Sequence, residues 1–324
     1  MSEGLASGHA AGGLRSLRAS RLRRMAGFVV GVVLLLAAVW VAVSRGVSTG
    51  GIRGAITGAP PWLVAAALLL PVFNWLIASL SLWVQTSRYG RVGLGEMTML
   101  VGAAWLLNYL PLRPGMFGRI AYHRTVNRIH VGDSVRALVV GMACGAAAVG
   151  CALAAAWLTP ASAPAGRWVL ALAPGPALAL TAAVAARGGA VSWLAAIFLV
   201  RCADIAIWTL RYWVVFRLVG SPIGPAQAIA VASVSQLALN VPLFGNGLGL
   251  REWSVGLAAA HLPEAWMNGV PRATVPAAIS ADLVNRAIEV AVAVPVGLAC
   301  SALVLRRSRR RRLNPDETDP RTHP

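Results

Sequence analysis

The chain contains six stretches of about twenty mostly apolar residues, each long enough to cross a lipid bilayer as a helix. They cover residues 25–44, 61–84, 135–158, 168–186, 190–215 and 274–304. Across the whole chain 57% of residues are hydrophobic and 12% are charged, whereas soluble domains have about 25% charged residues. A protein surface with so many apolar residues would aggregate in water, and we therefore expect lipid to cover it. The sequence therefore predicts an all-α, polytopic integral membrane protein with about six full transmembrane helices.

Two further apolar regions, residues 96–111 and 226–243, each run into a proline, then a glycine-rich break and then an arginine. Irregular backbone is tolerated at membrane depth only where protein or water satisfies its polar groups. We therefore interpret both regions as re-entrant helical hairpins, with the first covering residues 96–134 and the second covering residues 226–265.

The net charge of +18 arises from 29 basic residues, all arginine, against 11 acidic ones. With a cytoplasmic N-terminus and two hairpins, twenty of the 29 arginines lie in cytoplasmic segments, as the positive-inside rule requires. Eight full spans would instead place the arginine cluster 113–136 or the cluster 306–312 outside. We therefore predict a multi-pass protein of the cell inner (plasma) membrane with both termini cytoplasmic. Because the arginines cluster beside apolar runs, we expect no nucleic-acid partner.

The two hairpins resemble each other in sequence. In residues 108–119 and 240–252 an Asn precedes Pro-Leu, and a Gly stands four residues before an Arg. Three full spans separate the hairpins, so the second is predicted to be upside down relative to the first. This is the inverted-repeat plan of many transporters, with halves at about 61–158 and 190–304. The alternative is coincidence, because Pro and Gly recur in membrane helices.

The predicted membrane domain covers residues 25–305. A basic N-terminal arm, residues 1–24, precedes it, and we expect this arm to be disordered. A cytoplasmic tail, residues 306–324, follows it, and we expect this tail to be basic at first and then disordered. We interpret the arginines between residues 306 and 312 as a topology anchor that contacts anionic lipid headgroups.

One predicted span cannot compensate for its own charges. Residues 190–213 contain Arg201, Asp204 and Arg211 among nine Leu, Ile, Val or Phe residues. Those apolar residues return about 3–5 kcal/mol on insertion, whereas three central charges cost about 7–10 kcal/mol. We therefore expect this helix to face a polar interior, with Arg201 and Asp204 paired on one face.

The last span places Asp282, Arg286 and Glu289 on one stripe of a helix. This span and residues 190–215 are counterparts in the proposed repeat, so we predict that their charged faces meet. The functional interpretation is a water-containing cavity that accepts an anion. The structural alternative is a buried charge network that joins the helices.

The two breaks supply the second part of the candidate site. Where a helix unwinds, backbone N–H groups become free, and a new helix near Arg119 or Arg251 points its positive end at the break. Glycine permits close backbone approach, and arginine offers forked donors to phosphate oxygens. The alternative is that these arginines reach to lipid headgroups at the membrane surface. The predicted substrate-binding and translocation residues are Arg113, Gly115, Gly118, Arg119, Arg201, Asp204, Gly247, Gly249, Arg251, Glu252, Asp282, Arg286 and Glu289.

The sequence contains no serine elbow, no paired-aspartate motif and no phosphate loop, so we predict no catalytic residues. We expect no cofactor and no metal. His123 and His130 stand seven residues apart, and we interpret them as interface histidines on one helical face rather than as metal ligands.

The two broken motifs and the Asn285-Arg286 pair resemble the membrane domain of the lysylphosphatidylglycerol synthase/flippase family. The likeness covers about residues 25–305, although Met116 stands where the family would have an acidic residue. The resemblance implies a cavity between re-entrant helices that binds and moves lipid headgroups. The matching positions are Arg119, Arg251, Glu252 and Arg286. Because no soluble aminoacyl-transferase domain follows residue 305, we expect no synthesis of aminoacyl lipid.

The sequence thus favours a flippase-like lipid translocator that moves an anionic phospholipid or a polyprenyl-phosphate-linked lipid between leaflets. A second hypothesis is a membrane-embedded lipid-modifying enzyme, with Asp204, Asp282 or Glu289 as the acid or base. A third is an accessory membrane module for a separately encoded glycosyltransferase. Analysis of the lipid after incubation separates the first two, because a translocator leaves its substrate chemically unchanged.

Overall fold

The computed structural model describes residues 29–44, 54, 57–110, 114–159, 176, 180, 189–240, 245–263 and 272–313. Within these ranges the regular secondary structure is helical. Four helices are long and apolar enough to cross a membrane. They are α3 (Pro61–Ser87), α6 (Val131–Leu158), α9 (Gly189–Leu218) and α12 (Val275–Leu313). These helices confirm the prediction of an all-α, multi-pass membrane protein.

Shorter helices make up the rest of the described chain. They are Val29–Ser44, α4 (Leu94–Leu107), α5 (Pro114–Thr125), α10 (Pro225–Asn240), the 3-10 helix η1 (Gly245–Gly247) and α11 (Leu250–His261). Four of the six predicted spans correspond to the long helices, and the first corresponds to the shorter Val29–Ser44. The predicted span 168–186 falls almost wholly outside the described residues. The N-terminal arm, Pro111, Arg113 and Pro242 lie outside them too.

Proline begins several of these helices. Pro61 occupies the first turn of α3, and Pro114 and Pro225 are the first residues of α5 and α10. The first turn of a helix tolerates proline because its N–H groups have no partner within the helix. Pro71 and Pro295 lie inside α3 and α12, as is common in membrane helices.

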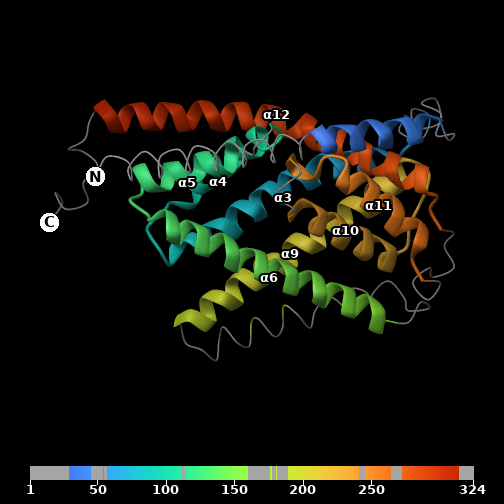
Figure 1. Ribbon diagram of the computed structural model, residues 1–324, viewed down its shortest axis with the longest axis horizontal. Coiled ribbons are helices and arrows are strands. Elements are labelled where there is room, and N and C mark those ends of the chain that lie inside the picture. The colour runs from blue at the N-terminus through green and yellow to red at the C-terminus, as the bar shows by residue number, and fades with distance from the viewer. Residues whose placement is uncertain are drawn as a thin grey trace, which may run out of the picture.

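The helices form two hairpins at different ends of the molecule (Figure 1). The pair α4 and α5 lies toward the end where α12 finishes, and the pair α10 and α11 lies toward the end where α12 begins. Helix α12 packs against α4 and α11, and α9 packs against α3, α6 and α10. Each hairpin therefore contacts long helices from both halves of the sequence.

Small side chains allow these helices to approach closely. Ala226, Ala228, Ala230 and Ala232 of α10 are all buried, and Ser233 and Ser235 continue the buried surface. Interfaces between membrane helices are enriched in such residues because lipid gives no hydrophobic drive for larger ones. Helix α10 consequently lies in the core, beside the charged residues described below.

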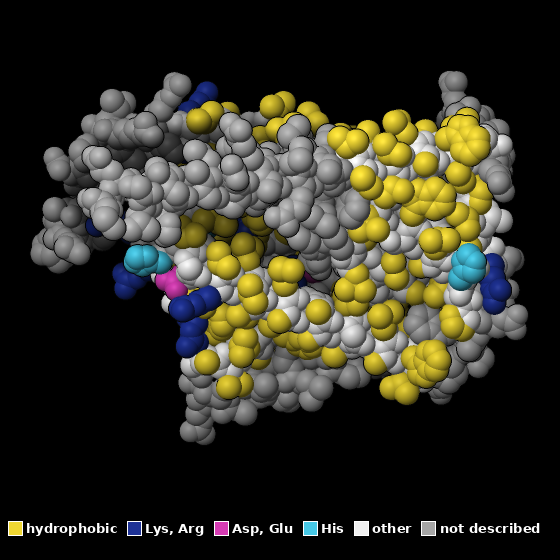
Figure 2. All heavy atoms as spheres, in the orientation of Figure 1, with side chains coloured by type: hydrophobic (Ala, Val, Ile, Leu, Met, Phe, Trp, Pro, Cys, Tyr) yellow, Lys and Arg dark blue, Asp and Glu magenta, His cyan; other side chains and the backbone are white. Residues whose placement is uncertain are grey.

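The outer surface has the distribution expected of a protein in a bilayer. Apolar side chains cover the middle of the visible face, and charged side chains gather at its two ends (Figure 2). Large apolar residues such as Leu69, Val139 and Leu298 are at least half exposed. An exposed apolar surface of this extent requires lipid around it.

Candidate functional site

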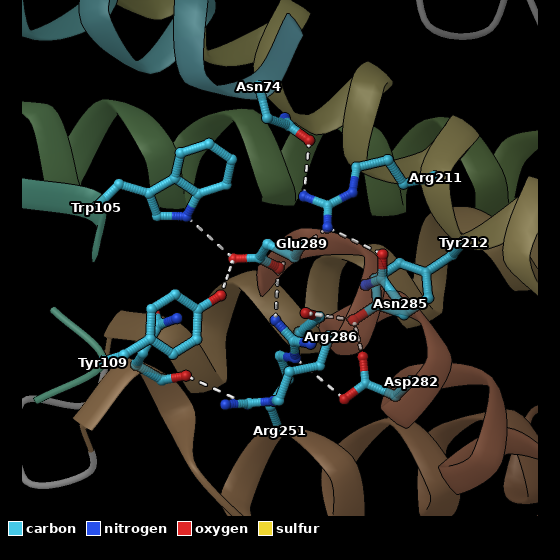
Figure 3. Close-up of polar contacts among 12 residues, drawn as sticks. Asn74, Trp105, Tyr109, Arg211, Tyr212, Arg251, Asp282, Asn285, Arg286 and Glu289 are labelled. Carbon is cyan, nitrogen blue, oxygen red and sulfur yellow. Dashed lines mark hydrogen bonds and ion pairs between the residues drawn. The ribbon is translucent and has the colours of Figure 1, made fainter. Parts of the chain in front are cut away.

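Glu289 of α12 is the centre of a buried polar network (Figure 3). Its Oε1 accepts hydrogen bonds from Tyr109 Oη at 2.9 Å and from Trp105 Nε1 at 3.3 Å. Its Oε2 accepts from Arg211 Nη2 at 3.0 Å and from Arg251 Nη1 at 3.3 Å. One carboxylate thus joins the region of α4 to α9 and α11.

Asp282, two turns earlier on α12, holds Arg251 from its other side. Arg251 Nε donates to Asp282 Oδ2 at 3.0 Å, and both side chains are 0% exposed. The Tyr212 hydroxyl lies 2.8 Å from Asp282 Oδ1 and 2.7 Å from Ser235 Oγ, so it connects α12 to α10. Both oxygens of this buried carboxylate therefore have hydrogen-bond partners.

Arg211 of α9 extends the network toward α3. It donates to Asn74 Oδ1 at 2.9 Å and to Asn285 Oδ1 at 2.9 Å, and its guanidinium lies 4.1 Å from the centroid of the Trp208 ring. Asn74 in turn donates to Asp204 Oδ1 at 3.1 Å. Asp204 also pairs with Arg201 at 3.5 Å, as the spacing of these two residues predicted.

Arg286 connects the network to the turn of the second hairpin and to α11. Its Nε lies 2.6 Å from Glu252 Oε1 as an ion pair, outside hydrogen-bond geometry, and its Nη2 donates to Asn246 O at 3.4 Å. Nη2 of Arg251 and Nη1 of Arg286 have no hydrogen-bond partner among the described residues. The charged faces of α9 and α12 therefore meet, and α11 joins them.

The charges of this network balance. Each of the four arginines forms an ion pair with at least one of four carboxylates. The arginines are Arg201, Arg211, Arg251 and Arg286, and the carboxylates are Asp204, Glu252, Asp282 and Glu289. Because the formal charges cancel, the network as a whole carries no net attraction for an anion. Anion binding in this region therefore depends on donor atoms that have no hydrogen-bond partner rather than on net charge.

The pocket that contains such donors lies between α6, α9 and α10. Its free space, counted together with the open solvent at its mouth, is about 420 Å³, and it is lined by Gly141, Gly145, Arg201, Asp204 and Gln236 among others. Arg201 Nε and Gln236 Nε2 are buried and have no hydrogen-bond partner among the described residues. Both atoms can only donate, so the pocket suits a group that accepts hydrogen bonds.

The glycines of the two motifs have structural explanations in the described chain. A Cβ on Gly249, whose φ is +74°, would collide with the backbone of Gly31 and the side chain of Leu34 in the helix Val29–Ser44. Trp253 fixes this contact by donating to Leu34 O at 3.1 Å. Gly247 has a φ of +68°, a conformation that favours glycine. The close approach at Gly249 is made by another helix of the chain.

The first hairpin is built differently around its glycines. A Cβ on Gly115 would meet the backbone of Ala104, and Asn108 Oδ1 accepts a hydrogen bond from Met116 N at 3.1 Å. One backbone N–H at the start of α5 is therefore capped by a side chain. A Cβ on Gly118 would meet nothing within 4 Å.

Arg119 does not belong to the central network. It has no hydrogen bond or ion pair within the described chain and lines a cavity with His123. Partial burial and, secondly, the positive charge of Arg201 lower the pKa of Arg119 to about 10, so it is charged at neutral pH. His123 is buried in α5, whereas the exposed His130 precedes α6. The prediction that these two histidines share one helical face is wrong, because α5 ends at Thr125.

Several neutral residues of the site were not predicted. They are Asn74, Trp105, Tyr109, Tyr212, Ser235 and Gln236. An isolated amide in an apolar helix, as at Asn74, was the available signal, because an amide facing lipid costs free energy.

Comparison with models of protein families, with curated proteins and with solved structures finds no match. The resemblance to the lysylphosphatidylglycerol synthase/flippase membrane domain therefore stays a prediction, and the function has to be inferred from the site.

Proposed function

We propose that the protein is a lipid translocator that moves a lipid with an anionic, phosphate-containing headgroup between the leaflets of a cell membrane. The observation that carries this proposal is the pocket between α6, α9 and α10, where Arg201 Nε and Gln236 Nε2 are buried donors without partners. Phosphate oxygens are acceptors that match such donors. The headgroup would bind here.

The rim of this pocket suits the acyl chains of a lipid. Met142 of α6 and Leu237 of α10 line the pocket and are 48% and 46% exposed. These side chains lie on the apolar outer surface, so a headgroup in the pocket would leave its chains among the membrane lipid. The network, to which Asp204 belongs, borders the pocket and carries no net formal charge.

The topology proposed from the sequence fits this role. In the proposal α4 with α5, and α10 with α11, are re-entrant hairpins in two inverted halves, and the end where α12 finishes is cytoplasmic. The described arginines at that end are Arg88, Arg91, Arg124, Arg128, Arg136, Arg306 and Arg307, whereas Arg217 and Arg272 lie toward the other end. This asymmetry is what the positive-inside rule requires.

A matched pair of glycine variants in α6 tests the headgroup pocket. Gly145 lines the pocket, with a Cβ position 3.8 Å from the Arg201 side chain, whereas a Cβ on Gly150 would meet nothing within 4 Å. We expect Gly145→Leu to fill the pocket and slow movement of a fluorescent anionic phospholipid in proteoliposomes by at least about tenfold. Gly150→Leu should move the lipid at the wild-type rate.

A charge-balanced variant provides the second arm. Arg201→Gln combined with Asp204→Asn removes one ion pair without leaving a buried charge. Folding should persist while translocation falls. Full translocation by both the Gly145→Leu protein and this double variant would rule out the pocket as the headgroup site. Chemical analysis of the recovered lipid distinguishes translocation from modification.

A further inference from the structure

A second cavity lies between the end of α3, α5 and the start of α6. Its free space, counted together with the open solvent at its mouth, is about 280 Å³, and its lining includes Gln85, Arg119, His123 and Ser134. Gln85 is 1% exposed and His123 is 3% exposed, so the polar part of the lining is buried. Gly141, which lines the headgroup pocket, lies directly against the Gln85 side chain. The two cavities are therefore neighbours along α6.

Three buried polar atoms in this lining have no hydrogen-bond partner among the described residues: Gln85 Oε1, His123 Nε2 and Ser134 Oγ. The Gln85 amide nitrogen donates to Ser81 Oγ at 2.8 Å, which orients the amide group, and the amide oxygen has no partner among the described residues. A buried polar group without a partner is costly to the folded state. Three such atoms around one cavity indicate a ligand that satisfies them together.

The tautomer of His123 is fixed by its neighbour. Asn127 Nδ2 lies 3.0 Å from His123 Nδ1, and an amide nitrogen can only donate. His123 Nδ1 is therefore the acceptor, and the proton of the neutral ring is on Nε2. Burial, and secondly the charge of Arg119, lower the pKa of His123 to about 4, so the ring is neutral at physiological pH.

The cavity therefore presents two kinds of group. Arg119 and His123 Nε2 donate, Gln85 Oε1 accepts, and the Ser134 hydroxyl does either. Arg119 adds a positive charge that no described carboxylate neutralises. A ligand that fits must carry negative charge, several acceptor oxygens and at least one donor.

We infer that this cavity binds a phosphate monoester group. A singly protonated monoester has acceptor oxygens for Arg119 and His123 and a P–OH donor for Gln85, whereas a phosphodiester without a hydroxyl group lacks that donor. A single water molecule offers donors and acceptors but leaves the charge of Arg119 unneutralised. The monoester can belong to a lipid headgroup or to a soluble phosphate, and the lipid source rests on the proposed function.

Binding to the full-length protein in phosphatidylcholine nanodiscs tests this inference by isothermal titration calorimetry. The probes are inorganic phosphate, a short-chain phosphatidate, and the methyl phosphodiester of the same diacylglycerol. We expect a monoester to bind at least about tenfold tighter than the diester, the effect of one hydrogen bond to a charged group. Phosphatidate binding identifies a lipid source, and binding of inorganic phosphate alone identifies a soluble one.

Variants assign the binding to this cavity. Arg119→Ala and Ser134→Ala should each weaken monoester binding about tenfold or more, since each removes a hydrogen bond to the phosphate. Arg124→Ala is the matched control, because Arg124 follows on the same helix but lines a different, more open pocket. Thermal unfolding of each variant confirms that it is folded, and Ser134→Ala changes a single hydroxyl group.

Equal affinity for monoester and diester would overturn the inference, as would unchanged monoester binding in both the Arg119→Ala and Ser134→Ala proteins. An experimental structure with one water molecule bonded to Gln85, His123 and Ser134 in saturating phosphatidate would do the same. Translocation without monoester binding contradicts this inference alone. Monoester binding without translocation contradicts the proposed function and leaves the binding site standing.

Discussion

The two hairpins share the order Asn, Pro-Leu, Gly and Arg, but their arginines have different surroundings. Arg251 of α11 is fully buried and paired with Asp282 and Glu289. Arg119 of α5 is partly exposed and has no ion pair within the described chain. The same motif therefore holds one arginine in a fixed network and leaves the other accessible to a ligand.

The cause of this difference is the long helix that follows each hairpin. Helix α12 carries Asp282 and Glu289 at the depth of α11, whereas α6 carries Ser134, Gly141 and Gly145 beside α5 and α9. The acidic residue of α6, Asp133, pairs with Arg136 at 3.4 Å in an exposed position. The partner helix therefore decides whether a motif arginine is held in ion pairs or lines a cavity without one.

Replacement of Arg251 gives the largest expected effect. Arg251→Ala leaves Asp282 and Glu289 buried with one partner fewer, which costs about 3–5 kcal/mol of unfolding free energy. Arg119→Ala removes no ion pair and should change it by less than about 0.5 kcal/mol. Denaturant or SDS titration of both proteins measures this contrast, and equal losses would show that the two arginines have equivalent roles.

Tyr109 tests how the first hairpin is attached to the network. Tyr109→Phe removes the 2.9 Å hydrogen bond to Glu289 and nothing else, so we expect a loss of about 1.5–3 kcal/mol. In the wild-type protein Tyr109 attaches the first hairpin to Glu289, as Arg251 attaches the second. A control is Tyr89→Phe, in a tyrosine whose ring packs edge-on against Trp193. Unchanged stability of Tyr109→Phe would show that the Tyr109–Glu289 hydrogen bond does not help to hold the first hairpin, which leaves packing and the Trp105 hydrogen bond to do so.

The membrane class and most long helices could be predicted from the sequence, because a run of apolar residues reports the thickness of the bilayer directly. The Arg201–Asp204 pair followed from helical spacing, and the polar surroundings of α9 followed from the cost of burying charge. These two predictions depend on local sequence and on large free energies. The meeting of the charged faces of α9 and α12 was predicted from the proposed repeat, which pairs the two helices.

The neutral polar residues of the site could not be predicted, because their role depends on which helices are neighbours. A membrane helix is apolar on its lipid face and on its packed face, so periodicity does not show where Asn74 or Gln85 points. The partner of Gly249 could not be found either, since the helix Val29–Ser44 is two hundred residues away in the chain. His123 became informative only when Asn127 and Ser134 were placed around it.

The buried His123 makes the first hairpin sensitive to acid in a way that the second is not. The pKa of His123 is about 4 in the folded protein, below the unfolded value near 6.5, so the unfolded state binds more protons between these values. Stability should be flat above pH 7 and fall by about 1–2 kcal/mol as the pH drops from 7 to 5. His123→Gln should flatten this part of the profile. An unaltered profile in His123→Gln would assign the acid sensitivity to another group.

Asn108 gives the smallest effect and tests how the start of α5 is held. Its side chain accepts the hydrogen bond from Met116 N, whereas Gly249 at the start of α11 makes no side-chain cap. Asn108→Ala should cost about 1 kcal/mol, as for other N-terminal caps, and should speed hydrogen exchange of the first amides of α5. Asn108→Asp keeps an acceptor and should retain most of the stability.

Gly118→Ala, in the open middle of the same helix, should instead add about 0.5–1 kcal/mol, because alanine loses less backbone entropy than glycine. If Asn108→Ala also weakens phosphate monoester binding while Gly118→Ala does not, then the fixed start of α5 is what positions Arg119 and His123 at the cavity. If both variants bind the monoester as the wild type does, the contacts of α5 with α6 suffice to position them.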